Sequence, residues 1–168
     1  MANRNVVIKP QTLPINLSPL GFHRYASEFL RAANSFKCGD NFSPVPYYLR
    51  CRVIELALKA FLLAKGFPKN DLKDKLRHNL ENALNSATKH GLQSEVAIKP
   101  EEAEEIKKAN VYYARKGFEY FQVGKFAKGY PELPDLKILA DVSSRLVSGL
   151  KDVCMKAAQQ RGGPDEGG

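Results

Sequence analysis

The chain has 168 residues and a formal net charge of +8, with 26 lysines and arginines against 18 acidic residues. Hydrophobic residues make up 43% and charged residues 26%, ordinary globular values that exclude a wholly disordered or fibrous protein. Domains usually hold about 100–200 residues, so we expect one domain with its own core.

The first half of the chain predicts an extended arm followed by two helices. Residues 1–17 contain three prolines and read as the arm. Ser18-Pro19 is a strong helix start, because serine can cap a free N–H and proline tolerates the first helical position. Ser43-Pro44 repeats this signal, and its helix should end near residue 65, with Gly66 as a left-handed stop. This second helix is apolar nearly all round, which predicts a central position.

The second half predicts further helices. Apolar residues keep the helical period from 72 to 87, as one helix or as a short one with a break near His78. Pro100 opens the next helix, and residues 136–157 follow the period of a long last one. No alternating strand pattern occurs, so residues 18–160 predict an all-α, up-and-down bundle of about five helices. Residues 161–168 read as a disordered tail.

The spacing of the cysteines and the length of the apolar segments predict the cellular location. The three cysteines lie far apart and unpaired in sequence, which predicts free thiols in a reducing compartment. The N-terminus lacks the apolar region of a signal peptide, and the apolar stretch 53–64 is too short to span a bilayer. We therefore expect a cytoplasmic protein that does not associate with membranes. No common phosphate, dinucleotide or metal motif occurs, so no cofactor and no metal are expected.

Residues 47–92 carry a pattern that resembles a known family. YYLRCRVIELALKAFLLAKG followed by LRHNLENALNSATKHGL is similar to the core of the HEPN superfamily, the helical-bundle proteins of higher eukaryotes and prokaryotes. The later Asn110, Tyr113 and residues 118–121 (FEYF) resemble the family's C-terminal half. The resemblance implies a dimer. It also implies either a metal-independent RNase of defence and toxin–antitoxin systems or a non-catalytic partner of a nucleotidyltransferase.

The nuclease members of that family carry arginine, four to six residues, and then histidine. The histidines here are His23, His78 and His90, and none has an arginine at that distance before it. Arg77 directly precedes His78. If both lie on a helix they point about 100° apart, so we do not expect them to meet at one phosphate. The missing spacing predicts no catalytic residues, and the resemblance then implies a non-catalytic dimeric protein that binds a nucleotide or RNA.

A polar line on the central helix supplies candidate ligand contacts. Its members, Arg52, Glu55 and Lys59, are spaced by three and four and should touch. His78 can contact Glu55 or a ligand phosphate, and Asn110 on the later helix completes the predicted ligand-binding set. The alternative is structural. Arg52, Glu55 and Lys59 would then form a solvated ladder of ion pairs, His78 would pack between helices, and Asn110 would be a polar latch that holds two helices together.

Two other functions remain open from the sequence. A divergent RNase would use His78 with Arg52 and Glu55, and a structural dimerisation module would bind no ligand. A basic concave surface would favour the binding protein over both.

A second candidate surface spans residues 107–130, where six cations face Glu119 alone and aromatic residues are interleaved. Basic and aromatic groups together can hold phosphates and stack on single-stranded bases. The alternative is a solvated basic face over aromatics of the core. The predicted nucleic-acid contacts are Lys107, Lys108, Arg115, Lys116, Lys125 and Lys128.

Overall fold

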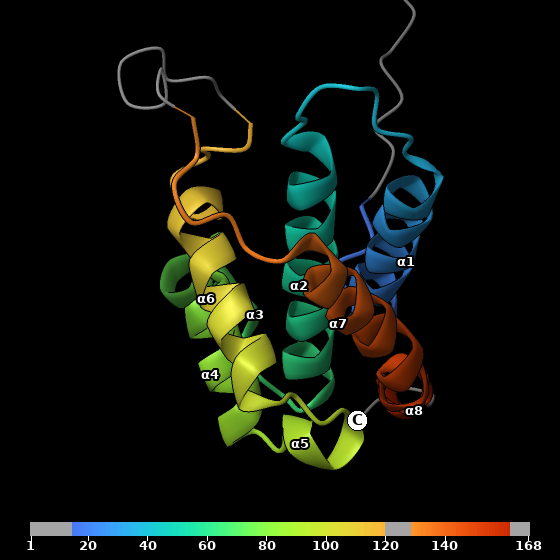
Figure 1. Cartoon of the computed structure of the whole chain (residues 1–168). Helices are drawn as coiled ribbons and strands as arrows, with labels where there is room; N and C mark the ends of the chain where they lie inside the picture. The colour runs from blue at the N-terminus through green and yellow to red at the C-terminus, as the bar shows by residue number, and fades with distance from the viewer. Residues whose placement is uncertain (1–14, 120–128, 162–168) are drawn as a thin grey trace, which may run out of the picture.

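The computed structural model describes residues 15–119 and 129–161, in which every regular element is a helix and no strand occurs (Figure 1). The predicted all-α bundle is therefore confirmed. The elements are α1 (Pro19–Ser35), α2 (Val45–Ala64), α3 (Lys69–Asp71), the π-helical turn η1 (Leu72–Leu76), α4 (Leu80–Lys89), α5 (Leu92–Glu95), α6 (Pro100–Tyr113), α7 (Leu136–Gly149) and α8 (Lys151–Arg161).

The predicted ends of the first two helices are present. The Ser18 hydroxyl accepts a hydrogen bond from the Gly21 N–H at 3.1 Å and caps α1. The second helix begins at Val45, directly after Ser43-Pro44. Gly66 follows its C-terminus with φ of 86°, a left-handed conformation that glycine adopts without steric cost.

The central position of α2 is also confirmed. It contacts α1, α4, α6, α7 and α8, and Figure 1 shows it in the middle of the bundle. Every residue from Val53 to Leu63 is buried, whereas Leu49, one turn nearer the start of α2, is only partly buried. A helix buried over most of its circumference carries its polar side chains into the core. This sets the geometry of the candidate site described below.

The open question about residues 72–91 is resolved as a break. After η1, Arg77 adopts φ of 44° and ψ of −122°, and the chain then turns into α4. Asn79 caps α4, its side-chain oxygen accepting from the Asn82 N–H at 2.8 Å. The break separates His78 from both helical segments, and this frees its side chain to turn toward α2.

The long last helix is divided at Leu150 into α7 and α8. Hydrogen bonds still cross the junction, from Leu150 N–H to the Leu146 carbonyl and from Cys154 N–H to the Leu150 carbonyl. Gly149 lies so close to Val96 that a Cβ atom would stand 2.5 Å from the Val96 Cγ2 atom. A glycine is therefore needed where α7 crosses the α5–α6 connection.

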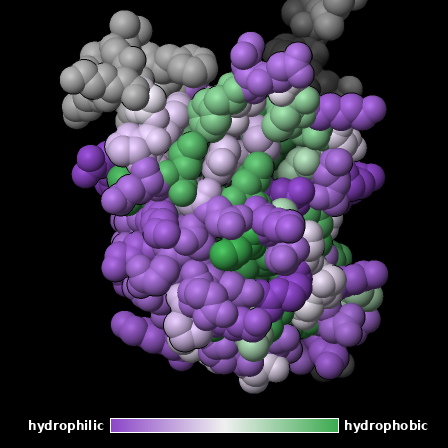
Figure 2. Space-filling model, viewed as in Figure 1, coloured by the Kyte–Doolittle hydropathy of each residue, from purple (hydrophilic) through white to green (hydrophobic). Residues whose placement is uncertain are grey.

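The surface is mostly hydrophilic on the face drawn in Figure 2, and the hydrophobic residues gather in its upper and central parts. Exposed large apolar side chains include Phe42, Val45 and Val111. Among the described residues, no helix combines the length and the apolar character needed to cross a membrane.

Candidate ligand-binding site

The centre of the site is the carboxylate of Glu55, whose side chain is only 1% exposed. Lys59 Nζ donates to Oε1 at 2.6 Å and Arg52 Nη1 donates to Oε2 at 2.9 Å. The contacts predicted from the spacing are therefore confirmed. The three charges form a buried cluster rather than a solvated ladder, because α2 is covered on nearly every side.

Two residues from outside α2 complete this cluster. The Tyr113 hydroxyl of α6 donates to Glu55 Oε2, and His78 Nδ1 lies 3.2 Å from Oε1. The rings of His78 and Tyr113 meet edge to face with centroids 6.3 Å apart. An ionised carboxylate only accepts hydrogen bonds, so His78 Nδ1 carries a proton in this contact. Glu55, Arg52, Lys59, Tyr113 and His78 are called the Glu55 cluster below.

The Glu55 cluster keeps Glu55 ionised. Burial by itself would raise the pKa of the Glu55 carboxyl, but Lys59, Arg52 and the hydrogen bonds hold that pKa below its ordinary value. Burial and the neighbouring carboxylate raise the pKa of Tyr113 far above its usual range, so its hydroxyl stays a donor. For Arg52, burial lowers the pKa, but Glu55 and Tyr113 together raise it by more, and the net direction of the pKa is upward. Two cations thus face one carboxylate, which leaves net positive charge in the core.

The strained backbone at Arg77 connects the Glu55 cluster to the surface. Lys59 Nζ also donates to the Arg77 carbonyl oxygen, at 2.5 Å. With its left-handed φ, Arg77 is not helical, and the side chains of Arg77 and His78 both line one cavity. The expectation that these two residues would not meet at one phosphate assumed a helix at the pair, and the backbone at Arg77 is not helical.

This cavity, called the basic cavity, has a volume of about 730 Å³ and lies between α1, α2 and the α3–η1 segment. Its apolar wall consists of Leu17, Phe22, Leu63 and Leu72. Its polar residues are Lys59, Lys69, Lys73, Arg77 and His78, with Asn70 and Asp74. Small-molecule sites combine such an apolar wall with a few polar groups. The arrangement suits an anion that carries an apolar part.

The predicted ligand-binding residues separate into three groups. Lys59 and His78 line the basic cavity. Arg52 and Glu55 do not line it, but Arg52 donates to Glu55 and Glu55 in turn accepts from the cavity-lining Lys59. Asn110 sits elsewhere, where its Oδ1 accepts from the backbone N–H of Leu80 at 2.8 Å and its amide donates to the Asn79 side chain at 3.2 Å. Asn110 therefore joins α6 to the start of α4, as the polar-latch alternative describes.

Sequence reasoning missed four residues of the site. Tyr113 was singled out only as part of a family pattern, and nothing in its spacing indicated Glu55 as its partner. The cavity-lining Lys69, Lys73 and Arg77 were not assigned a role. A cluster of basic residues at 69–77 was the available signal for these three.

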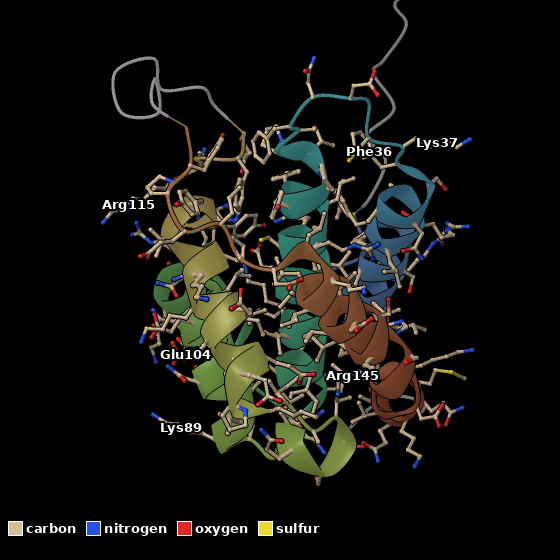
Figure 3. All side chains as sticks on the ribbon, viewed as in Figure 1. Phe36, Lys37, Lys89, Glu104, Arg115 and Arg145 are labelled. Carbon is tan, nitrogen blue, oxygen red and sulfur yellow. The ribbon has the colours of Figure 1, made fainter. Side chains whose placement is uncertain are left out.

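The basic aromatic segment is described only in part. Lys107, Lys108, Arg115 and Lys116 are exposed on α6 and the turn after it, and Figure 3 shows Arg115 pointing away from the bundle. The aromatic side chains of Tyr112, Tyr113 and Phe118 are buried in the core, as the solvated-face alternative expects. The remaining predicted contacts, Lys125 and Lys128, lie outside the described residues.

Comparison with family models, curated proteins and solved structures finds no match to this chain. The resemblance to the HEPN superfamily therefore stays a prediction from the sequence, and the functional conclusion depends on the site itself.

Proposed function

We propose that this chain is a non-catalytic, HEPN-like binding protein whose basic cavity holds the phosphate of a nucleotide or of RNA. The observation that carries the proposal is the composition of the cavity, in which lysines, an arginine and a histidine face an apolar wall. Phosphate groups bind such cations, and apolar side chains accept a base or a sugar edge.

The charge balance around the basic cavity supports an anionic ligand. Among the described residues that line the cavity, Asp74 is the single acid. Lys59 uses two of its three N–H donors on Glu55 and Arg77, which leaves one for a ligand. Because the Glu55 cluster already contains one cation more than Glu55 can neutralise, a bound phosphate would lower the electrostatic free energy of the site.

The remaining parts of the proposal depend on the resemblance alone. They are a homodimer, a cytoplasmic location, and a nucleotidyltransferase-type partner in a bacterial defence or toxin–antitoxin pair. Light scattering on the purified chain would test the dimer, and identification of polypeptides that co-purify with it would test the partner.

Titration with ATP and with a short single-stranded RNA, each at low and at moderate salt, tests the main proposal. Replacing Lys69 and Lys73 by alanine should weaken binding of the RNA and flatten its salt dependence by about 0.7 log unit for each phosphate that is no longer neutralised. The matched control is Lys75→Ala, because Lys75 lies on the same turn but pairs with Asp71 at 2.7 Å and does not line the cavity.

Equal losses of affinity in the control and the double variant would contradict the proposed site. No binding of either probe at low salt would overturn the proposal and favour a structural dimerisation module.

A divergent metal-independent RNase is the second candidate function, because of the contact between His78 and Glu55. With Nδ1 directed at the carboxylate, Nε2 is left to accept a proton from a hydroxyl that attacks a phosphodiester. Cleavage of RNA by purified protein that is lost in both His78→Ala and His78→Gln, but kept in Lys75→Ala, would establish this activity. Absence of cleavage in the unmodified protein would exclude it under those conditions.

A further inference from the structure

A second cavity lies at the opposite end of α2 from the basic cavity. It is open to solvent, has a volume of about 630 Å³ and is lined by the end of α1, the N-terminal half of α2 and the start of α7. Phe36, near the upper end of α1 in Figure 3, contributes to its apolar lining together with Pro46 and Leu136. Its polar side includes Arg50, Lys137 and the thiol of Cys38. This space is called the Arg50 cavity.

The guanidinium of Arg50 is held only by neutral groups. Nη1 donates to the Ser143 hydroxyl at 3.3 Å, and Nη2 donates to the Asn34 side-chain oxygen at 2.8 Å. Within the described residues, neither Arg50 nor Lys137 forms an ion pair. Charges taken from water are normally paired, and a guanidinium has five N–H donors of which these contacts use two. A half-buried arginine with unused donors at a cavity wall is suited to an anion.

We propose that the Arg50 cavity binds a small organic monocarboxylate. Its carboxylate lies on Arg50 and Lys137, and its apolar part packs against Phe36, Pro46 and Leu136. The planar fork of arginine matches the two oxygens of a carboxylate. This site does not depend on the function proposed for the basic cavity.

Nearby acids favour a single negative charge over a phosphate dianion. Asp141 acts electrostatically on Arg50. Asp135 accepts from the N–H groups of Lys137 and Ile138 at 2.7 and 3.2 Å, so it already occupies the positive end of α7. Because Asp141 already acts on Arg50 and Asp135 already occupies the start of α7, a second negative charge on the ligand would add repulsion from these acids.

The exposed thiol of Cys38 lines the Arg50 cavity, so its rate of chemical modification can report whether a ligand is bound there. The other two cysteines, Cys51 and Cys154, are buried. Burial raises the pKa of Cys154 to about 12 and raises the pKa of Cys51 as well, so neither thiol forms a reactive thiolate near neutral pH. A thiol reagent should therefore modify Cys38 selectively, and a ligand in the cavity should slow that reaction.

The test measures the rate of Cys38 modification in the full chain at constant pH and ionic strength, with calorimetry of benzoate binding in parallel. Acetate, butyrate and benzoate are expected to protect in increasing order, because the apolar part grows. Benzamide, the uncharged analogue of benzoate, is expected to protect little. Inorganic phosphate is expected to protect less than benzoate.

Two variants connect this protection to the proposed contacts. Arg50→Lys keeps the charge but loses the fork, and Lys137→Gln removes an exposed cation. Each should weaken benzoate binding by roughly tenfold, the loss expected for one charged hydrogen bond. The matched control is Lys37→Gln, a lysine beside Cys38 that does not line the cavity. Thermal unfolding of each variant verifies that the fold is retained.

Three results would overturn the proposal. The first is the absence of both protection and binding heat with benzoate. The second is protection by benzamide or by phosphate that equals that of benzoate. The third is unchanged benzoate affinity in both variants, or an equal loss in Lys37→Gln.

Discussion

The two halves of α2 handle charge differently. In the C-terminal half, Glu55 is buried and accepts hydrogen bonds from Lys59, Arg52 and Tyr113 while also contacting His78. In the N-terminal half, Arg50 is partly exposed and is bonded only to the neutral side chains of Asn34 and Ser143.

The two halves of α2 therefore differ in how much their charged side chains depend on neighbouring charges. In the Glu55 cluster, Lys59 and Arg52 both contact the buried carboxylate of Glu55, so removing Glu55 leaves these cations without their counter-charge, which is costly. Within the described residues Arg50 forms no ion pair, although Asp141 acts on it electrostatically, so replacing Arg50 breaks no direct contact with an opposite charge. Substitution of Glu55 or Tyr113 should therefore lower folding stability strongly, whereas substitution of Arg50 should act mainly on binding in the Arg50 cavity. The predictions below test that division, from the largest expected effect to the smallest.

Replacing Glu55 by glutamine should have the largest effect. The change keeps the side-chain shape but leaves Lys59 and Arg52 without their buried counter-charge, so the free energy of unfolding should fall by about 3–5 kcal/mol. Urea unfolding measures this loss. The control is Glu28→Gln, which breaks an exposed pair with Arg24 and should cost less than about 1 kcal/mol. Equal effects of the two changes would refute the compensation argument.

Replacing Tyr113 by phenylalanine should cause the next largest loss in the free energy of unfolding. The ring stays in the core, but the buried carboxylate loses one donor, so unfolding should become easier by about 1.5–3 kcal/mol. Tyr130→Phe is the matched control, because the Tyr130 hydroxyl donates to the neutral carbonyl of Gly117 at 2.9 Å. Its expected loss is about 0.5–1.5 kcal/mol. A larger loss in the control than in Tyr113→Phe would contradict the importance of the charged acceptor.

Acid should remove the contribution of Glu55. Since its folded pKa lies below its ordinary value, Glu55 stabilises the fold fully above its unfolded pKa of about 4.3, and this contribution is lost as pH falls through the folded pKa. Unfolding free energies measured from pH 7 down to pH 3 should therefore converge for the unmodified protein and Glu55→Gln. Parallel curves over that range would show that Glu55 does not titrate as described.

Arg50→Gln should have the smallest effect on folding. It removes hydrogen bonds to Asn34 and Ser143 without leaving a carboxylate unpaired, so the expected loss is about 0.5–1.5 kcal/mol in urea unfolding. A loss as large as that of Glu55→Gln would show that Arg50 has a structural role comparable to the Glu55 cluster. The comparison between the two halves of α2 would then fail.

Much of the local structure was predictable from short-range signals. The caps at Ser18 and after Ala64 follow from residue types whose backbone preferences act within one turn. The contacts of Glu55 with Arg52 and Lys59 follow from helical spacing, since residues three and four apart lie on one side of a helix. Of the two contacts considered for His78, with Glu55 or with a ligand phosphate, the one with Glu55 is present.

Other features depended on long-range packing and were missed. Tyr113 lies 58 positions after Glu55, and only the packing of α6 against α2 brings the two together. The sequence does not decide between one helix and a break near His78, because the apolar period continues across Arg77, although the chain is not helical there. Periodicity reports which residues face inward, but it contains no information about which inward-facing polar groups meet.

The sequence by itself determined the all-α class, the central position of α2 and the pairing within one face of that helix. These properties depend on hydrophobic periodicity and on neighbours within about one turn. The tertiary structure decided that the Arg52–Glu55–Lys59 line is buried, that Tyr113 and His78 complete it, and that two separate cavities lie at the two ends of α2. Burial and cavity shape depend on how several helices pack in three dimensions, and no single segment of the chain carries that information.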